Sequence, residues 1–379
     1  MPLLSRQSAP IAVYGATGYT GRLVVEELAK AGADFIVSGR NAARLDELRR
    51  ELKLDAPAIK AEIGDPESLR GLLSDCAVVI DCAGPFVRLG EPVLRAAVET
   101  STHYLDTTGE QPYMKMAFER YGPGAADAEV AVIPAMGFDY VPGDMIASLT
   151  AEGMGELDDV ALAYSWQGFT PSQGTARTTL EILSGTSVEW RNMEWRKASG
   201  GFGSGSFDFP DPVGRQRMVR YPAGEQITVP RHVPTRNVST TMNAAAFSSE
   251  RLAPLFVATM GAAGIALRTP LKRIVRTAIS RLPEGPTPEQ RERMRWMIVC
   301  EVRREGRARR GVISGTDVYG LTAASVTRGA ILVAKSGFGG RGALAPSQAF
   351  DTKEFLRSLE RFDVRWRFFD SVVPQPVEA

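Results

Sequence analysis

The sequence has few of the residues that mark metal, disulfide and acid–base sites. Only two of its 379 residues are histidine and three are cysteine. Cys76, Cys82 and Cys300 cannot all pair within one chain, and none lies in a C-x-x-C motif, which favours a reducing compartment and no metal site. The motifs G-x-S-x-G, G-x-x-x-x-G-K-[ST] and H-E-x-x-H are also missing, so hydrolase, kinase and metalloprotease chemistry has no support.

Net charge is almost absent as well. Lys and Arg number 45 against 44 Asp and Glu, a formal charge of +1, so no overall field attracts nucleic acid and we expect no such partner. The chain begins without a leader of the signal-peptide type, and we expect a cytoplasmic protein. Hydrophobic residues at 44% and charged residues at 23% are typical of a globular protein, and this length allows two or three domains.

Short apolar runs alternate with helical patterns over residues 10–134. We expect strands at residues 11–14, 35–38, 58–63, 78–81 and 130–133. We expect helices at residues 20–31, 42–52, 67–73 and 92–100. Strands that alternate with helices form a parallel sheet through right-handed crossovers. Residues 1–150 therefore predict an α/β domain of the Rossmann type, with a doubly wound parallel sheet.

The alternation ends near Pro142. Strand-like stretches separated by glycine, proline and serine follow, and they predict an α+β substrate domain over residues 151–317. Residues 318–379 hold two further helical patterns, at 321–333 and 352–359. We expect this last segment to pack back on the Rossmann domain.

The strongest chemical signal is the turn Gly15-Ala-Thr-Gly18-Tyr-Thr-Gly21, which lies between a predicted strand and a predicted helix. Glycine lets the backbone turn sharply, approach a pyrophosphate and bring the helix close to the sheet. The helix N-terminus then offers N–H groups and the positive end of its dipole to the phosphates. From this turn we predict cofactor contacts by Gly15, Thr17, Gly18, Tyr19, Thr20 and Gly21.

The end of the second strand indicates which dinucleotide binds. It reads Ser38-Gly39-Arg40-Asn41, where NAD-specific folds carry an acidic residue for the ribose hydroxyls. A guanidinium can instead pair with a 2′-phosphate, and Arg44 lies one helical turn further on. We predict NADP as the cofactor, held here by Arg40, Asn41 and Arg44. The alternative is that Arg40 is a solvated residue at the start of a helix.

Residues after the later strands should border the same ligand, because it lies across the carboxyl ends of a parallel sheet. Predicted cofactor contacts there are Asp65, Ala83, Gly84, Pro85 and Phe86. Ala83 and Gly84 are small enough for the dinucleotide to pass. Asp65 has a second interpretation, which we favour, as the cap of the helix that begins at Pro66.

Together with other motifs, the glycine turn resembles the saccharopine dehydrogenase-like oxidoreductases. The resemblance is carried by Gly15–Gly21, Cys82–Phe86, Gly90–Val93, Thr102–Glu110 and Gly137-Phe-Asp-Tyr-Val-Pro-Gly-Asp144. The last is similar to the family's G-F-D-S-V-P-x-D, with Tyr140 in place of Ser. Within the family, the sequence most resembles the branch of trans-acting enoyl reductases. The resemblance implies NADP-dependent reduction, and in that branch it implies acyl or polyketide substrates.

Hydride transfer would belong to the nicotinamide, so the protein has to orient the acceptor and supply a proton. Catalytic candidates are Asp106 and Asp139 first, then Tyr104 and Tyr140, with Glu110 and His103 in the same motif region. Both aspartates have structural alternatives. Asp106 could order its own loop through backbone N–H groups, and Asp139 could cap the helix after Pro142.

An uncharged apolar segment at residues 252–267 precedes a basic one. The basic residues are Arg268, Lys272, Arg273, Arg276 and Arg281. The apolar segment is shorter than the ~20 residues that span a membrane. Two interpretations stay open: a buried wall of the second domain, which we favour, or a surface that meets an acyl chain or a membrane.

We predict an NADPH-dependent reductase that acts on an activated C=C bond of an apolar acyl, polyketide or lipid-like substrate. One alternative is a C=N reductase or amino-acid dehydrogenase of the saccharopine type. Another is an NADP-binding protein without turnover, associated with lipid or with partner enzymes. Expected partners are the small apolar substrate, in carrier-linked form in one version, and a second copy of the chain in a homo-oligomer. Peripheral membrane contact is a further expectation.

Overall fold

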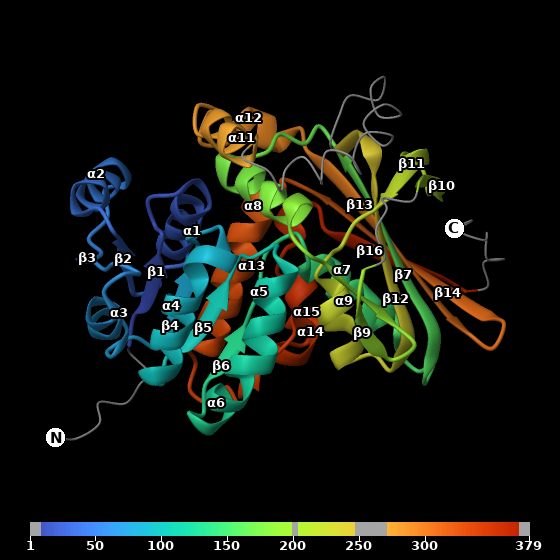
Figure 1. Ribbon diagram of the computed structural model, residues 1–379, viewed down its shortest axis with the longest axis horizontal. Helices are drawn as coiled ribbons and strands as arrows, with labels where there is room; N and C mark the ends of the chain where they lie inside the picture. Colours follow the sequence, from blue (N-terminus) through green and yellow to red (C-terminus); the bar gives the residue numbers. More distant parts are fainter. Residues whose placement is uncertain (1–8, 199–203, 247–270, 371–379) are drawn as a thin grey trace. The chain divides into compact units, whose positions relative to one another are not determined.

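The computed structural model describes residues 9–198, 204–246 and 271–370. The chain divides into two compact units (Figure 1). The first unit comprises residues 1–138 and 319–350, and the second comprises residues 139–318 and 351–379. The apolar segment at residues 252–267 lies outside the described residues. Among the helices that are described, none has the length and apolar character to cross a membrane.

The first unit is built on a parallel sheet of seven strands in the order β15-β6-β5-β4-β1-β2-β3. The strands are β1 (Ile11–Tyr14), β2 (Phe35–Gly39), β3 (Ala58–Lys60), β4 (Val78–Asp81), β5 (His103–Asp106), β6 (Ala131–Ile133) and β15 (Gly342–Ala343). Every residue of β1 and β4 is buried, as expected when both faces of a parallel sheet are covered. The strand order changes direction between β1 and β4, where such sheets bind ligands. The predicted Rossmann-type fold is confirmed.

Helices alternate with these strands. They are α1 (Tyr19–Lys30), α2 (Ala42–Leu52), α3 (Pro66–Leu73), α4 (Phe86–Glu99), α5 (Gln111–Met116), a π-helical turn (Ala117–Tyr121), α6 (Gly122–Asp127), α13 (Val318–Val333) and α14 (Pro346–Ala349). Helix α4 begins at Phe86 and not at residue 92 as predicted. Pro92 lies inside the helix, and the first N–H groups of α4 find an acceptor in the distant carboxylate of Glu110.

The second unit holds a mixed sheet of nine strands. The path is β10-β11-β12-β7-β13-β14-β16, and β8 pairs with β12 and β9. The strands are β7 (Leu157–Gln167), β8 (Val188–Arg191), β9 (Glu194–Lys197), β10 (Ser204–Phe209), β11 (Gly214–Arg220), β12 (Thr235–Asn243), β13 (Arg295–Arg304), β14 (Arg307–Thr316) and β16 (Arg365–Asp370). Strands β12 and β7 are parallel, and the other printed pairs are antiparallel. The predicted α+β character is confirmed.

Helices of the second unit include one that is almost wholly buried, α7. The helices are α7 (Val141–Ala151), α8 (Gln173–Ser184), α9 (Glu225–Thr228), α11 (Leu271–Ile279), α12 (Pro288–Glu292) and α15 (Thr352–Arg357). Helix α7 packs on β13 and β14, and Gly311 of β14 leaves room there for Ile146 and Thr150.

The predicted C-terminal segment, residues 318–379, divides between the two units. Residues 319–350 belong to the first unit, where β15 pairs with β6. Strand β16 instead pairs with β14 and extends the sheet of the second unit. Residues 139–150, which we assigned to the Rossmann domain, belong to the second unit, because α7 is part of its core.

Candidate functional site

The glycine turn after β1 is packed backbone against backbone. Gly15 has φ of +80°, and a Cβ atom there would lie 3.0 Å from the backbone of Cys82 and Ala83. A Cβ atom on Gly21 would overlap with the carbonyl oxygen of Gly15. The turn, the first helical turn of α1 and the end of β4 can approach this closely only because these positions are glycine.

The N-terminus of α1 is bare. Its N-cap residue, Gly18, makes no side-chain cap, and the first turn carries no acidic residue. The next two helices differ, since the side chain of Asn41 caps α2 and that of Asp65 caps α3. An uncapped helix start beside a small-residue turn suits an anionic ligand such as a pyrophosphate. The residues present therefore fit the dinucleotide that the turn predicts.

Arg40 and Arg44 stand at the carboxyl end of β2. Arg40 follows the last strand residue, Gly39, and both arginine side chains are exposed. Asn41 caps α2 by accepting a hydrogen bond from the Arg44 N–H at 3.2 Å. Two guanidinium groups thus lie where a 2′-phosphate is expected in this fold, and the phosphate contacts of all three residues stay predictions.

Asp65 caps α3, the interpretation that we favoured. Its Oδ1 accepts a hydrogen bond from the Ser68 N–H at 3.3 Å. The segment after β4 has a different anchor, because the Ala83 N–H donates to Asp81 Oδ1 at 2.8 Å. Ala83, Gly84 and Pro85 are partly exposed and Phe86 is buried. Cofactor contacts by Asp65 and by residues 83–86 stay predictions.

A buried polar network lies under this segment. The Tyr104 hydroxyl lies 3.3 Å from Asp81 Oδ2 and 2.7 Å from the Tyr113 hydroxyl. Gly90 makes room for the Tyr113 ring, since a Cβ there would come within 2.7 Å of it. Burial raises the pKa of Asp81 and of Tyr104 well above their ordinary values. The Tyr104 hydroxyl is therefore a buried member of a network that supports the end of β4.

Asp106, at the end of β5, holds the turn that follows β6. Its Oδ1 accepts hydrogen bonds from the Thr108 N–H at 2.9 Å and the Ala135 N–H at 2.8 Å. Ala135 has φ of +63°, which a residue with a side chain rarely adopts. The structural alternative for Asp106 is thus confirmed.

The same carboxyl group also has the properties of an acid. Oδ2 of Asp106 has no hydrogen-bond partner among the residues that the structure describes. Burial raises the pKa of Asp106 to about 7, against the opposing effect of its two backbone hydrogen bonds. Asp106 can therefore carry a proton near neutral pH.

Glu110 has a role that the motif alone did not reveal. Its two carboxylate oxygens accept hydrogen bonds from the Phe86 N–H and the Val87 N–H, each at 2.9 Å. These are the first N–H groups of α4, whose N-cap, Pro85, provides no side-chain cap. Glu110 is thus a cap supplied from 24 positions away along the chain. The sequence held one sign of this role: Pro85 precedes the helix and has no side chain that could cap it, so the cap had to come from elsewhere.

Asp139 and Tyr140 lie in the second unit, at the start of α7. The structural alternative for Asp139, a cap of this helix, does not hold, because Tyr140 is the N-cap residue and no side-chain cap is present. Asp139 as a whole residue is partly exposed, whereas its carboxyl group lies away from water, and this burial raises the pKa of Asp139 to about 6. Tyr140 is buried, and burial raises its pKa well above the ordinary value.

A second buried acid lies close to Asp139, and no local sequence pattern indicated it. Glu225 is the first residue of α9, and its side chain is fully buried. The Tyr164 hydroxyl contacts Glu225 Oε1 and lies 3.3 Å from the carbonyl oxygen of Asp139. Oε2 of Glu225 has no partner within the described part of the chain, and burial raises the pKa of Glu225 well above its ordinary value. A Cβ atom on Gly143 would overlap with Glu225 Oε1 and the Tyr164 hydroxyl.

One of the two histidines joins this group. His232 Nε2 lies 2.8 Å from Oδ1 of the fully buried Asp144, the last residue of the Gly137–Asp144 motif. The other histidine, His103, accepts a hydrogen bond from the Ala131 N–H through Nδ1 and belongs to the first unit. We call Asp139, Asp144 and Glu225 the carboxyl cluster.

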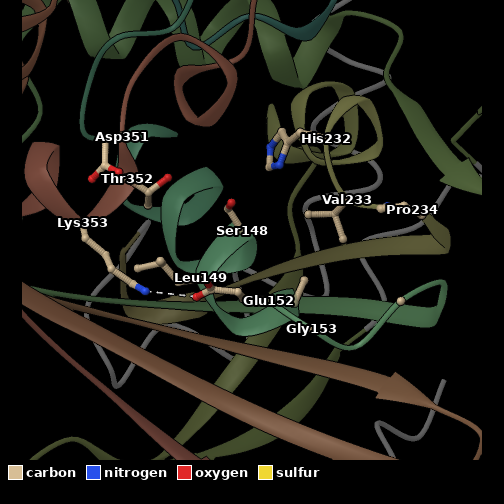
Figure 2. Close-up of a pocket in the computed structure, with 12 residues that line it drawn as sticks. Ser148, Leu149, Glu152, Gly153, His232, Val233, Pro234, Asp351, Thr352 and Lys353 are labelled. Carbon is tan, nitrogen blue, oxygen red and sulfur yellow. Dashed lines mark hydrogen bonds and ion pairs between the residues drawn. The ribbon is translucent and has the colours of Figure 1, made fainter.

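His232 also lines a pocket of about 450 Å3 that belongs entirely to the second unit. Figure 2 shows His232 and Val233 on one side of this pocket and Asp351, Thr352 and Lys353 on the opposite side. An ion pair between Lys353 and Glu152 spans 3.1 Å at its rim.

The comparisons with known proteins agree with this geometry. Residues 11–133 match the model of the saccharopine dehydrogenase NADP-binding domain. Two proteins of Mycobacterium tuberculosis named as trans-acting enoyl reductases are each 35% identical to this chain, over 185 and 162 residues. These segments cover 46% and 40% of this chain and 44% and 39% of the relatives. A human saccharopine dehydrogenase-like oxidoreductase is 32% identical over 152 residues, 36% of this chain and 35% of that protein.

The fold is also that of a solved enzyme. Saccharopine dehydrogenase (L-Glu forming) of Saccharomyces cerevisiae matches with a TM-score of 0.60 over 96% of this chain and 100% of that one, at 14% identity. The matched segments of the curated relatives cover less than half of each relative's length. NADP is the cofactor indicated by the family model, as Arg40 and the absence of an acidic residue after the second strand predicted. Residues 11–133 of this chain are thus an NADP-binding domain similar to that of saccharopine dehydrogenase.

Proposed function

We propose that this protein is an NADPH-dependent reductase that transfers hydride to an activated C=C bond of an apolar acyl, polyketide or lipid-like substrate. The main support for NADPH binding is the N-terminus of α1, which has no side-chain cap and directly follows the turn at Gly15. The choice of a C=C acceptor is supported by the similarity to proteins named as trans-acting enoyl reductases.

The charges inside the protein do not by themselves choose between an uncharged and a charged acceptor. In the described residues, the charged residues buried as a whole are Asp81, Asp106, Glu110, Asp144, Glu225 and Glu301, and guanidinium nitrogens of Arg231 and Arg328 are also shielded from water. An amino acid or keto acid brings its own carboxylate, which needs a cationic partner once it leaves water. Burial raises the pKa of Asp81, Asp106 and Glu225, so these groups need not carry charge, and the preference for C=C reduction over C=N reduction is supported by the similarity to proteins named as enoyl reductases.

We propose different roles for the two candidate acids, Asp139 and Asp106: proton donation for the first and positioning for the second. When bound, NADPH supplies the hydride, and one proton has to reach the reduced product from the protein or from water. We assign that proton to Asp139, because burial raises the pKa of its carboxyl to about 6, close enough to neutral pH for proton transfer. Asp106 is fully buried and is a positioning residue that holds the turn at Ala135. Tyr104 and Tyr140 support the acids as buried neighbours.

Steady-state NADPH oxidation tests this proposal. An enoyl thioester should accept hydride, whereas a keto acid with ammonia should not. The opposite selectivity would support the C=N alternative, and NADPH binding without oxidation across both substrate classes would support a binding protein without turnover. Asp139→Asn should lower the single-turnover rate about a hundredfold, a typical contribution of general acid catalysis. Asp211→Asn, in an exposed loop of the same unit, is the matched control.

We further propose that a basic face of α11 contacts anionic surfaces, either a membrane or the carrier of a substrate. Lys272 and Arg276 are held by Glu181 of α8, at 2.6 and 3.1 Å, which leaves the exposed Arg273 of α11 and Arg281, two residues past the end of this helix, for such a contact. Ile274, 67% exposed, lies beside them. Flotation with anionic vesicles at low salt, compared with Arg273→Glu, tests the membrane version, and light scattering tests the proposed homo-oligomer.

A further inference from the structure

An aromatic side chain from late in the chain packs on the cofactor turn of the first unit. The ring of Tyr319, near the start of α13, lies edge-on to the ring of Tyr19, with 5.2 Å between the ring centres and 89° between the ring planes. Both residues belong to the first unit. We propose that Tyr319 is a positioning residue for NADPH, which holds the Tyr19 ring beside the bare start of α1 and keeps the pyrophosphate site open.

Tyr19 is the first residue of α1 and stands at the edge of this site. Side chains of a helix lean toward its N-terminus, so a ring at this position can reach over the first N–H groups of α1. Those N–H groups have no acceptor within the helix and no side-chain cap, and a pyrophosphate would use them. Because Tyr19 is only partly buried, its ring has room for more than one staggered orientation unless a neighbour fixes it.

Tyr319 is a firm support, because α13 is anchored along its length. Tyr319 itself is only 5% exposed. Oγ1 of Thr322, one turn further on, accepts a hydrogen bond from the Phe138 N–H at 2.9 Å. Two turns beyond that, a Cβ atom on Gly329 would lie 2.9 Å from Cε of Met136. Helix α13 therefore cannot shift without breaking its contacts with the segment after β6, and the ring of Tyr319 stays in place.

The contacts of α13 belong to the edge of the sheet at which dinucleotides bind. Tyr19 follows β1 and Phe138 follows β6, and the strand order places β4 and β5 between these two strands. The first turn of α13 thus connects the carboxyl ends of strands on both sides of the point where the order changes direction. The inference rests on the proposed function, and it adds a residue from outside the matched NADP-binding domain, residues 11–133.

The size of the effect follows from preorganisation. The two rings touch before NADPH arrives, so their contact changes the affinity only through the fraction of protein in which Tyr19 leaves the site open. An edge-to-face pair is strong enough to shift such an equilibrium by about twofold to tenfold. Loss of the Tyr319 ring should weaken NADPH binding by the same factor.

Fluorescence titration with NADPH is the first test, after urea unfolding has shown that each variant is folded. Tyr319→Met and Tyr319→Leu lack the ring and should bind about twofold to tenfold more weakly than the wild type, and either one that folds is sufficient. Tyr319→Phe keeps the ring and should bind as the wild type does. An affinity equal to that of the wild type in a folded ringless variant would overturn the inference, as would an equal loss in Tyr319→Phe.

Phe338→Leu is the matched control. It removes another edge-to-face pair of the first unit, in which the rings of Phe338 and His103 lie 5.9 Å apart at an angle of 87°. His103 is the first residue of β5, at the opposite end of the strand from the cofactor edge. This variant should bind NADPH with the affinity of the wild type. A loss as large as that in Tyr319→Met would show a general effect of lost packing and would overturn the positioning role.

A second series of titrations shows whether Tyr319 acts through Tyr19. In Tyr19→Ala the ring that needs support is gone, so the addition of Tyr319→Met should not change the affinity for NADPH any further. A loss of the same size with and without the Tyr19 ring would overturn the inference, because Tyr319 would then act on NADPH or on folding directly. No binding of NADPH to the folded wild type would refute the proposed function together with the inference. Binding to the wild type with equal affinities in the variants would refute the inference alone.

Discussion

Replacement of Asp106 by Asn should change how the stability of the protein depends on pH. The pKa of Asp106 rises from an ordinary value of 3.8 to about 7 in the folded protein. Because the unfolded chain loses this proton first, stability falls as pH rises from about 4 to 7 and stays reduced above that. One pKa unit corresponds to about 1.4 kcal/mol, so ionisation of Asp106 costs the folded state up to about 4 kcal/mol. Asn keeps an oxygen for the Thr108 and Ala135 N–H groups and never ionises.

Urea unfolding at pH 5 and pH 8.5 measures this effect. The wild type should lose stability between the two values by more than Asp106→Asn does, and the difference between the two proteins isolates this one carboxyl from the other buried acids. Asp46→Asn, an exposed aspartate on α2, should follow the wild type at both pH values. Equal pH dependence in the wild type and Asp106→Asn would refute the claim that Asp106 holds a proton near neutral pH.

Two glycine replacements test the close contacts of each unit. Gly21→Ala should move α1 away from the Gly15 turn and weaken NADPH binding at least tenfold in a fluorescence titration, since overpacking costs roughly 1–3 kcal/mol. Gly71→Ala, which meets nothing within 4 Å, should bind normally, and equal affinities would contradict the packing argument. Gly143→Ala should lower the free energy of unfolding by a similar amount through overlap with Glu225 and Tyr164, and an unchanged stability would disprove that contact.

The features that the sequence predicted correctly depend on residues close together along the chain. The turn Gly15–Gly21 and the alternation of strands and helices are local patterns, and so is the cap that Asp65 forms with Ser68. Periodicity and capping chemistry act over a few residues, which is why these features can be read without a structure.

The features that the sequence did not predict depend on contacts between residues far apart along the chain. Glu110 caps α4 from 24 positions away, Tyr164 meets Glu225 across 61 positions, and His232 meets Asp144 across 88. No local pattern indicates such pairs, and the pKa changes of the buried acids arise only when folding removes water. The alternative of a cap by Asp139 does not hold, because the helix begins with Tyr140 as its N-cap residue and its first turn is buried.

Calorimetric titration with NADPH and NADH most directly tests the central claim, that the bare start of α1 and Arg40 bind a phosphorylated dinucleotide. We predict binding of NADPH to the wild type, with an affinity for NADPH that falls about tenfold to a hundredfold in Arg40→Ala while NADH binding is unchanged, the usual loss of a charge-assisted contact. No heat with either nucleotide, in folded protein, would contradict the account, and an NADPH preference that survives Arg40→Ala would contradict the role of Arg40.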